Sequence, residues 1–161
     1  MKKITLSIVY EEYDSLQELA ESDRRLMEQA IAAAKGAYAP YSHFQVGAAV
    51  RLASGKVVTG ANQENAAYPS GLCAERTALF YAHAQYPDDP ITAIAIVAMV
   101  NGQLTESLTY PCGACRQVLA ETQMRAKAPV RILVGSQKQV LVFHQVEDLL
   151  PFIFDNLPEK D

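Results

Sequence analysis

The sequence predicts an α/β protein, a three-layer α-β-α sandwich around one mixed sheet of roughly five strands. Residues 44–52 and 57–62 are strand-like runs on either side of residues 53–56 (ASGK), which is typical of a β-hairpin. Residues 91–100 and 130–134 are strongly apolar, as expected of strands buried on both faces. Because helical segments alternate with these later strands, we expect helices on both faces of the sheet.

Local signals define the elements before the hairpin. Residues 4–10 alternate between apolar and polar side chains and are expected to form a short strand. Ser22 is the expected N-cap of a helix over residues 23–37, whose apolar positions fall along one side. We therefore treat residues 1–21 as an accessory N-terminal extension and residues 22–161 as a single domain.

The elements after the hairpin complete the expected layers. A helix is expected over residues 73–86, ended by the two prolines of residues 87–90, and another over residues 113–124. Residues 140–143 are expected to form a short edge strand. Residues 145–150 are expected to start a final helix.

Composition and charge exclude several classes of partner. The chain has 161 residues, half of them apolar, and a net charge of −4, which argues against a broad basic surface for nucleic acid or anionic lipid. No stretch approaches the about 18–20 apolar residues of a membrane helix, and residues 10–14 interrupt any signal-peptide pattern. An odd number of cysteines argues against a disulfide framework. We therefore expect a cytoplasmic protein that binds neither nucleic acid nor membrane.

All three cysteines lie in two short motifs. Cys112 and Cys115 form a C-x-x-C pair at the start of one expected helix, and Cys73 begins another. A helix N-terminus favours thiolate over thiol, and three thiolates suit a zinc ion that keeps one coordination position open. Zinc is preferred over calcium or magnesium because thiolates are soft ligands. We therefore expect a zinc-dependent hydrolase that acts on a small molecule.

Three charged residues beside the cysteines are candidate participants in the reaction. Glu75, two residues after Cys73, is expected to transfer protons beside the metal rather than to bind it. Three thiolates and one dication sum to a charge of −1, so Arg76 and Arg116 are expected to donate hydrogen bonds to the sulfurs. The alternative makes both arginines surface ion-pair partners, and makes Glu75 a helix N-terminal glutamate favoured by the dipole.

Four motifs in a fixed order resemble one known family. They are residues 38–49 (YAPYSHFQVGAA), 62–68 (NQENAAY), 73–78 (CAERTA) and 111–117 (PCGACRQ). In this order they resemble the zinc-dependent nucleoside deaminases, specifically the small cytidine deaminases. The resemblance extends over residues 25–154 and implies a cytidine deaminase-like fold, one zinc ion per chain and a homotetramer.

The same resemblance implies a reaction and a metal site. Cys73, Cys112 and Cys115 would bind the zinc ion, and Glu75 would carry the proton. The reaction would be hydrolytic deamination of cytidine and 2′-deoxycytidine at C4, as in pyrimidine salvage. It releases ammonia and leaves uridine or 2′-deoxyuridine.

The resemblance also implies contacts with the substrate. Asn62 and Glu64 would bind the ribose 3′-hydroxyl, Phe44 would stack near the base, and the backbone of Ala74 would contact the pyrimidine edge. Phe154 would reach the site from a neighbouring subunit. Without the resemblance, Asn62 and Glu64 would be interpreted as a solvated loop, and Phe44 as a core residue.

Two other functions remain open at this point. A zinc deaminase of another aminated nucleoside or a nucleoside antibiotic would share the metal site, and Asn62 and Glu64 are useful only if the substrate contains a ribose. A non-catalytic zinc-binding or nucleoside-binding protein would be expected to have a fourth ligand and no base such as Glu75.

Overall fold

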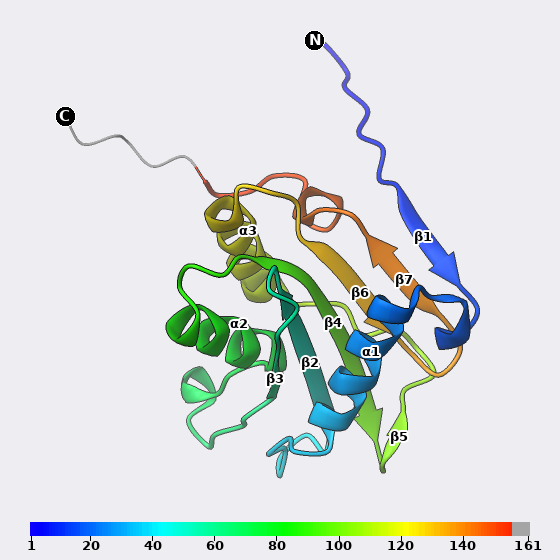
Figure 1. Cartoon of the computed structure of the whole chain (residues 1–161), viewed down its shortest axis with the longest axis vertical. Coiled ribbons are helices and arrows are strands. Elements are labelled where there is room, and N and C mark those ends of the chain that lie inside the picture. Colours follow the sequence, from blue (N-terminus) through cyan, green and yellow to red (C-terminus); the bar gives the residue numbers. More distant parts are fainter. Residues whose placement is uncertain (156–161) are drawn as a thin grey trace, which may run out of the picture.

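A seven-stranded sheet with helices on both faces forms the centre of the computed structural model, which describes residues 1–155 (Figure 1). The strands are β1 (Tyr10–Tyr13), β2 (Gln45–Leu52), β3 (Val57–Ala61), β4 (Ile91–Val100), β5 (Gln103–Leu104), β6 (Arg131–Gly135) and β7 (Val140–Phe143). The helices are α1 (Glu21–Ala34), α2 (Ala74–Gln85) and α3 (Gly113–Ala126), and 3₁₀ turns occur at η1 (Leu16–Glu18), η2 (Tyr68–Ser70) and η3 (Val146–Asp148). The predicted α/β sandwich is confirmed, and β1 and β5 make the sheet larger than expected.

The two apolar runs form neighbouring central strands. The strand order is β1-β7-β6-β4-β2-β3, and β5 pairs with β4. β4 and β6 run parallel, with Ile94 opposite Ile132, whereas the other strand pairs are antiparallel. α3 lies in the chain between these two parallel strands, so they form a β-α-β unit with the C-x-x-C motif at the start of its helix.

α1 covers one face of the sheet, whereas α2 and α3 cover the other (Figure 1). Glycines in the strands allow close approach of two helices. A Cβ added at Gly47 would lie 2.1 Å from the Ala30 carbonyl oxygen of α1. A Cβ added at Gly60 would lie 2.5 Å from the Ala78 backbone nitrogen of α2. Direct backbone contact with β3 therefore fixes the position of α2 and of the cysteine that precedes it.

The N-terminal strand is displaced from its predicted position. The strand expected over residues 4–10 is wrong, because residues 1–9 have no strand partner in the described part of the chain and β1 begins at Tyr10. Tyr10 pairs with Phe143, the last residue of β7. Residues before Tyr10 therefore run past the end of the strand with which β1 pairs, a limit that no local pattern could reveal.

Three further boundaries differ from expectation. Residues 140–143 form a fully buried strand rather than an edge strand, because β1 pairs with the outer side of β7. Residues 145–150 contain only the turn η3 instead of a longer helix. α1 begins after Ala20 rather than with a Ser22 cap and ends at Ala34, before the predicted boundary.

The N-terminal extension joins the fold from Tyr10 onward, while its boundary at residue 21 stays a prediction. Asp23 of α1 is 5% exposed and accepts hydrogen bonds from Arg51 and Arg131, at 3.1 and 2.9 Å. Arg131 also donates to Glu11 of β1 at 3.1 Å. This ion-pair network connects β1, α1, β2 and β6, with the buried Asp23 carboxylate at its centre.

Candidate metal centre and active site

The three cysteines meet where two helices begin. Cys73 is the N-cap of α2 and Cys112 is the N-cap of α3, whereas Cys115 lies in the first turn of α3. Their sulfurs all lie within 4.8 Å of one another, and those of Cys112 and Cys115 are 3.5 Å apart. Within residues 1–155, no other three cysteine, histidine or acidic side chains converge in this way. Three soft donors at this spacing fit one zinc ion, so the predicted zinc centre is confirmed.

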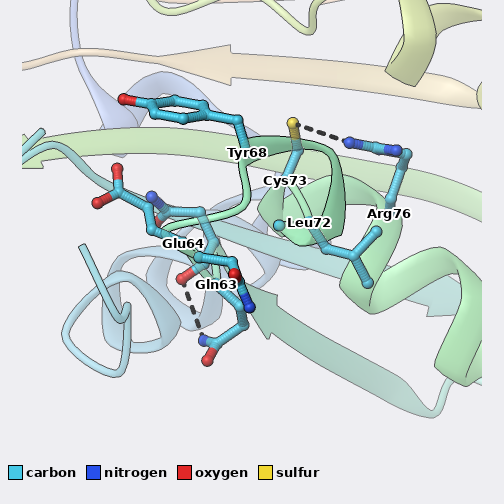
Figure 2. A pocket seen from close by; sticks show the side chains of 9 residues that line it. Gln63, Glu64, Tyr68, Leu72, Cys73 and Arg76 are labelled. Atoms are coloured by element: carbon cyan, nitrogen blue, oxygen red, sulfur yellow. Dashed lines mark hydrogen bonds between the residues drawn. The ribbon is translucent and has the colours of Figure 1, made fainter. Parts of the chain in front are cut away.

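The sulfur of Cys73 is strongly polarised. The Cys115 thiol and the Arg76 guanidinium both form hydrogen bonds with it, and these lower the pKa of Cys73 to about 5. Arg76 Nη2 lies 3.7 Å from the Cys73 sulfur, a contact drawn as a dashed line in Figure 2. The pKa of Cys115 is raised, first because its thiol is the partner that keeps the shared proton and next because it is buried. The cluster therefore contains a thiolate even before any cation neutralises it.

Glu75 lies in the first turn of α2, immediately beside this cluster. Its side chain is buried, with 5% of its surface exposed. Burial raises the pKa of Glu75, and the nearby negative charge of Cys73 raises it further. Its carboxylate is not among the ligand atoms that converge at the cysteine cluster. A buried carboxyl with a raised pKa beside a metal centre is suited to accept and return a proton.

The two arginines act differently from one another. Arg76 donates to Cys73 as expected, and its Nε atom is buried without a hydrogen-bond partner among residues 1–155. Arg116 donates instead to the carbonyl oxygens of Pro111 and Leu149, at 2.8 and 2.6 Å. The expectation that Arg116 donates to a thiolate is not met. Its hydrogen bonds go instead to neutral carbonyl oxygens on the segments before and after α3. Arg116 thus connects the loop before Cys112 to the C-terminal segment.

The Asn62–Glu64 loop is fixed by side-chain contacts with other segments. The Glu64 carboxylate accepts hydrogen bonds from the backbone nitrogens of Tyr41 and Ser42, at 2.9 and 3.2 Å, and from the Ser42 hydroxyl. The Ser42 hydroxyl is the main reason that the pKa of Glu64 lies below its ordinary value. Sequence reasoning missed Tyr41 and Ser42 as partners of Glu64, although both lie in the first of the four motifs.

Asn62 joins the end of β3 to the start of β2. Its Oδ1 accepts from the Val46 backbone nitrogen at 2.7 Å, and its Nδ2 donates to the Phe44 carbonyl oxygen at 2.9 Å. One lone pair of Oδ1 and one hydrogen of Nδ2 remain for another partner. Asn62 therefore holds the backbone of Phe44, a residue that is half-buried.

A cavity of about 220 Å³ lies between this loop and the start of α2. Figure 2 shows Glu64, Tyr68, Cys73 and Arg76 around it. The complete lining consists of Asn62, Gln63, Glu64, Asn65, Tyr68, Gly71, Leu72, Cys73 and Arg76. The cavity thus joins the candidate ribose-binding residue Glu64 to the metal ligand Cys73, whereas Phe44 and Glu75 lie outside its lining.

The predicted base-binding and subunit-bridging residues lie in different surroundings. Ala74 is fully buried in the first turn of α2 and does not line the cavity. Phe154 is 70% exposed, and its backbone forms hydrogen bonds with the Gln117 side chain of α3, at 2.8 and 3.4 Å. Gln117 was not predicted to have a role, although it closes the C-x-x-C-R-Q motif.

The site has the donor set of a zinc-dependent hydrolase. Three thiolates would hold a zinc ion and leave room for a water ligand, and the buried Glu75 is not among the converging ligand atoms. Comparison with known proteins then defines the family. Residues 20–129 match the family model for the cytidine and deoxycytidylate deaminase zinc-binding region, and the chain belongs to this family.

Relatives of known name agree with this assignment. A cytidine deaminase of Halalkalibacterium halodurans is 45% identical over 129 residues, a match that covers 80% of this chain and 91% of that protein. A cytidine deaminase of Mycobacterium tuberculosis is 38% identical over 140 residues, covering 84% and 92%. The crystal structure of a cytidine deaminase from Burkholderia pseudomallei superposes with a TM-score of 0.70 at 44% identity, covering 81% of this chain and 97% of that one.

Proposed function

We propose that this chain is an enzyme that hydrolyses cytidine and 2′-deoxycytidine to uridine and 2′-deoxyuridine with release of ammonia. The observation that best supports this function is the pairing of a three-thiolate centre with the buried, non-ligating Glu75. Membership of the deaminase family gives the reaction type, and the relatives named cytidine deaminase give the substrate class.

Cys73, Cys112 and Cys115 would hold one zinc ion, which when bound supplies a Lewis acid that makes a water molecule acidic at neutral pH. Glu75 accepts one proton from the attacking water and delivers it to N3 of the pyrimidine. It then accepts the remaining proton from the new C4 hydroxyl and delivers it to the amine, which departs as ammonia while the C4 carbonyl forms. The raised pKa of Glu75 suits this task, because a carboxyl that is protonated closer to neutral pH returns its proton more readily.

Arg76 would keep the zinc centre acidic. Three thiolates leave a net charge of −1 around a zinc ion, which weakens its ability to acidify water. The guanidinium withdraws electron density from the Cys73 sulfur through its hydrogen bond, so it offsets part of that charge.

Asn62 and Glu64 would bind the ribose 3′-hydroxyl as a matched donor and acceptor. Three hydrogen bonds to the Glu64 carboxylate leave it one acceptor position, which suits the hydroxyl proton. The remaining hydrogen of Asn62 Nδ2 can donate to the hydroxyl oxygen. Phe44 would stack near the base, and the Ala74 backbone would contact the pyrimidine edge.

We further propose that the enzyme is a homotetramer in which Phe154 closes the active site of a neighbouring subunit. The exposed rings of Phe154 and Tyr68 support this arrangement, since large aromatic side chains in solvent are typical of subunit interfaces. Gln117 holds the backbone of Phe154 so that its ring projects outward.

We propose a cytoplasmic location and no nucleic-acid partner. Metal binding requires the three cysteines in reduced form, which a reducing compartment maintains. The net charge of −4 disfavours a polyanionic substrate. Among residues 1–155, no helix has the length and apolar character needed to cross a membrane.

The decisive experiment is a substrate panel with zinc-loaded enzyme. Cytidine, 2′-deoxycytidine, cytosine and adenosine are each followed by ultraviolet absorbance and by ammonia release. We expect turnover of the two cytosine nucleosides and little with free cytosine, which lacks the ribose that Glu64 would bind. Absence of turnover of both nucleosides by metal-loaded protein would refute the proposal.

A further inference from the structure

The first nine residues form an exposed apolar arm that the proposed reaction does not use. In Figure 1 they leave β1 as an extended blue segment that projects away from the sheet. Ile4 is 78% exposed, Leu6 is 59% exposed and Val9 is 70% exposed. An exposed row of large apolar side chains is uncommon on a soluble protein unless another surface covers it.

The arm has the pattern of a strand but no strand partner within residues 1–155. Ile4, Leu6 and Ile8 alternate with Thr5 and Ser7, and this alternation continues into Tyr10 of β1. β1 is the first strand in the order of the sheet, so one side pairs with β7 and the other presents free backbone groups. A strand edge of this kind is a template for pairing with another strand.

Charged side chains flank the apolar segment on both sides. Lys2 and Lys3 precede the apolar segment, and Glu11 and Glu12 follow it, whereas residues 4–10 have no charged side chain. Protective charges, which commonly prevent edge-to-edge pairing, are therefore missing from the middle of this strand. A strand with a basic start and an acidic end complements a second copy of itself in the antiparallel orientation.

We propose that the arm pairs antiparallel with the same arm of a second copy of this chain, about a two-fold axis at Ser7. In this register the opposed residues are Lys2 and Glu12, Lys3 and Glu11, Ile4 and Tyr10, Thr5 and Val9, and Leu6 and Ile8. Directly opposed residues share a face of the sheet, so the apolar side chains at even positions in both arms form one continuous patch. Both pairs of end charges are then opposite in sign.

The contacts within one chain are compatible with this register. Glu12 is exposed and takes part in no ion pair among the described residues, so it is free to meet Lys2 of the second copy. Glu11 already contacts Arg131 and His144, so the pair of Lys3 with Glu11 is the weaker of the two. We therefore base the charge test on Lys2 and Glu12.

The alternative occupant of the arm is its own chain. Within one chain, residues 6–8 of the arm line a small cavity together with Gln145, Glu147, Asp148 and Pro151, so this part of the arm lies beside the segment after β7. That arrangement leaves Ile4 exposed and gives the end charges no function. It also predicts no contact between the arms of two copies, and this difference makes the proposal testable.

Cysteine cross-linking in the full-length, zinc-loaded protein tests the register. Opposed Cα atoms in an antiparallel pair lie about 4.5–5.5 Å apart, which is within the range of a disulfide. Under mild oxidation with diamide, Ser7→Cys is expected to give a reducible dimer as the main band on a non-reducing gel. A mixture of Thr5→Cys and Val9→Cys proteins is expected to cross-link several-fold more than either protein alone. Unsubstituted protein is the control for the exposed Cys112.

Charge reversal provides an independent test. In the Ser7→Cys background, Lys2→Glu is expected to lower the dimer yield several-fold, and Lys2→Glu with Glu12→Lys is expected to restore it. Lys2, Ser7 and Glu12 are exposed and lie outside the catalytic site, so zinc content and turnover should not change. Absence of the Ser7→Cys dimer, cross-linking of Thr5→Cys alone as efficient as the mixture, or failure of the double reversal would each overturn the proposal.

Discussion

Gly60→Ala in β3 is expected to damage the metal site without altering any residue of it. The added Cβ would lie 2.5 Å from the Ala78 nitrogen and 2.8 Å from the Ala74 carbonyl oxygen, both in the backbone of α2. Van der Waals contacts between such atoms are about 3.5 Å or longer, so α2 must move away from the sheet by roughly an ångström. Cys73 immediately precedes Ala74, and the displacement reaches the metal ligand directly.

The structure sets the size of the expected effects. Overpacking of this kind costs about 1–3 kcal/mol, which for a chain of this length lowers the apparent Tm by roughly 3–10 °C. A misplacement of about 1 Å near reacting groups can lower turnover roughly 100-fold. Thermal unfolding at a fixed protein concentration, zinc release to a competing chelator and kcat for cytidine measure the three consequences.

Gly113→Ala is the matched control, although it lies much nearer the metal. Gly113 stands between Cys112 and the rest of α3, and a Cβ there would meet nothing within 4 Å. Alanine in a helix is favoured over glycine by up to about 1 kcal/mol, so stability should be unchanged or slightly higher. If Gly60→Ala retained the stability, zinc affinity and turnover of Gly113→Ala, close packing of α2 on β3 would not be what positions Cys73.

Three further predictions concern the site itself. Glu75→Gln should retain about one zinc ion per chain and lose roughly 10²–10⁴-fold in kcat, and a variant with normal turnover would remove Glu75 from proton transfer. Glu64→Ala should raise KM for cytidine roughly tenfold or more and leave zinc content unchanged, because the hydroxyl loses its acceptor; an unchanged KM would argue against ribose binding there. Zinc removal by a chelator should lower both turnover and Tm, and added zinc should restore them, because a metal ion that binds only the folded arrangement of the three sulfurs stabilises the folded state; an unchanged Tm on zinc removal would contradict a metal site formed by these cysteines.

Predictions from the sequence succeeded where a local pattern determines the structure. The continuous apolar run at residues 91–100 gave the bounds of β4, because burial on both faces requires apolar side chains at every position. The cysteine spacing gave the metal centre, because a C-x-x-C pair at a helix start can occupy only one face of the first turn.

Other features depend on partners that are distant in the chain. The position of β1 is set by where β7 ends, so alternation alone placed the strand too early. The direction of Arg116 depends on the Leu149 carbonyl, and the contacts of Glu64 depend on the backbone of Tyr41 and Ser42. Residue type indicates which hydrogen bonds are possible, but tertiary structure decides which acceptor is nearest.

The first turn of α3 connects the metal centre to the C-terminal segment. Cys112 and Cys115 lie at this helix start, and the next two residues, Arg116 and Gln117, hold the carbonyl of Leu149 and the backbone of Phe154. The short segment of residues 112–117 therefore positions both the zinc ligands and the ring proposed to enter a neighbouring site. Any shift of α3 that disturbs the metal must also displace Phe154, because both depend on the same few backbone positions. The proposed closure of a neighbouring active site by Phe154 would therefore be physically coupled to metal binding, through the Arg-Gln pair that directly follows the second cysteine of the motif.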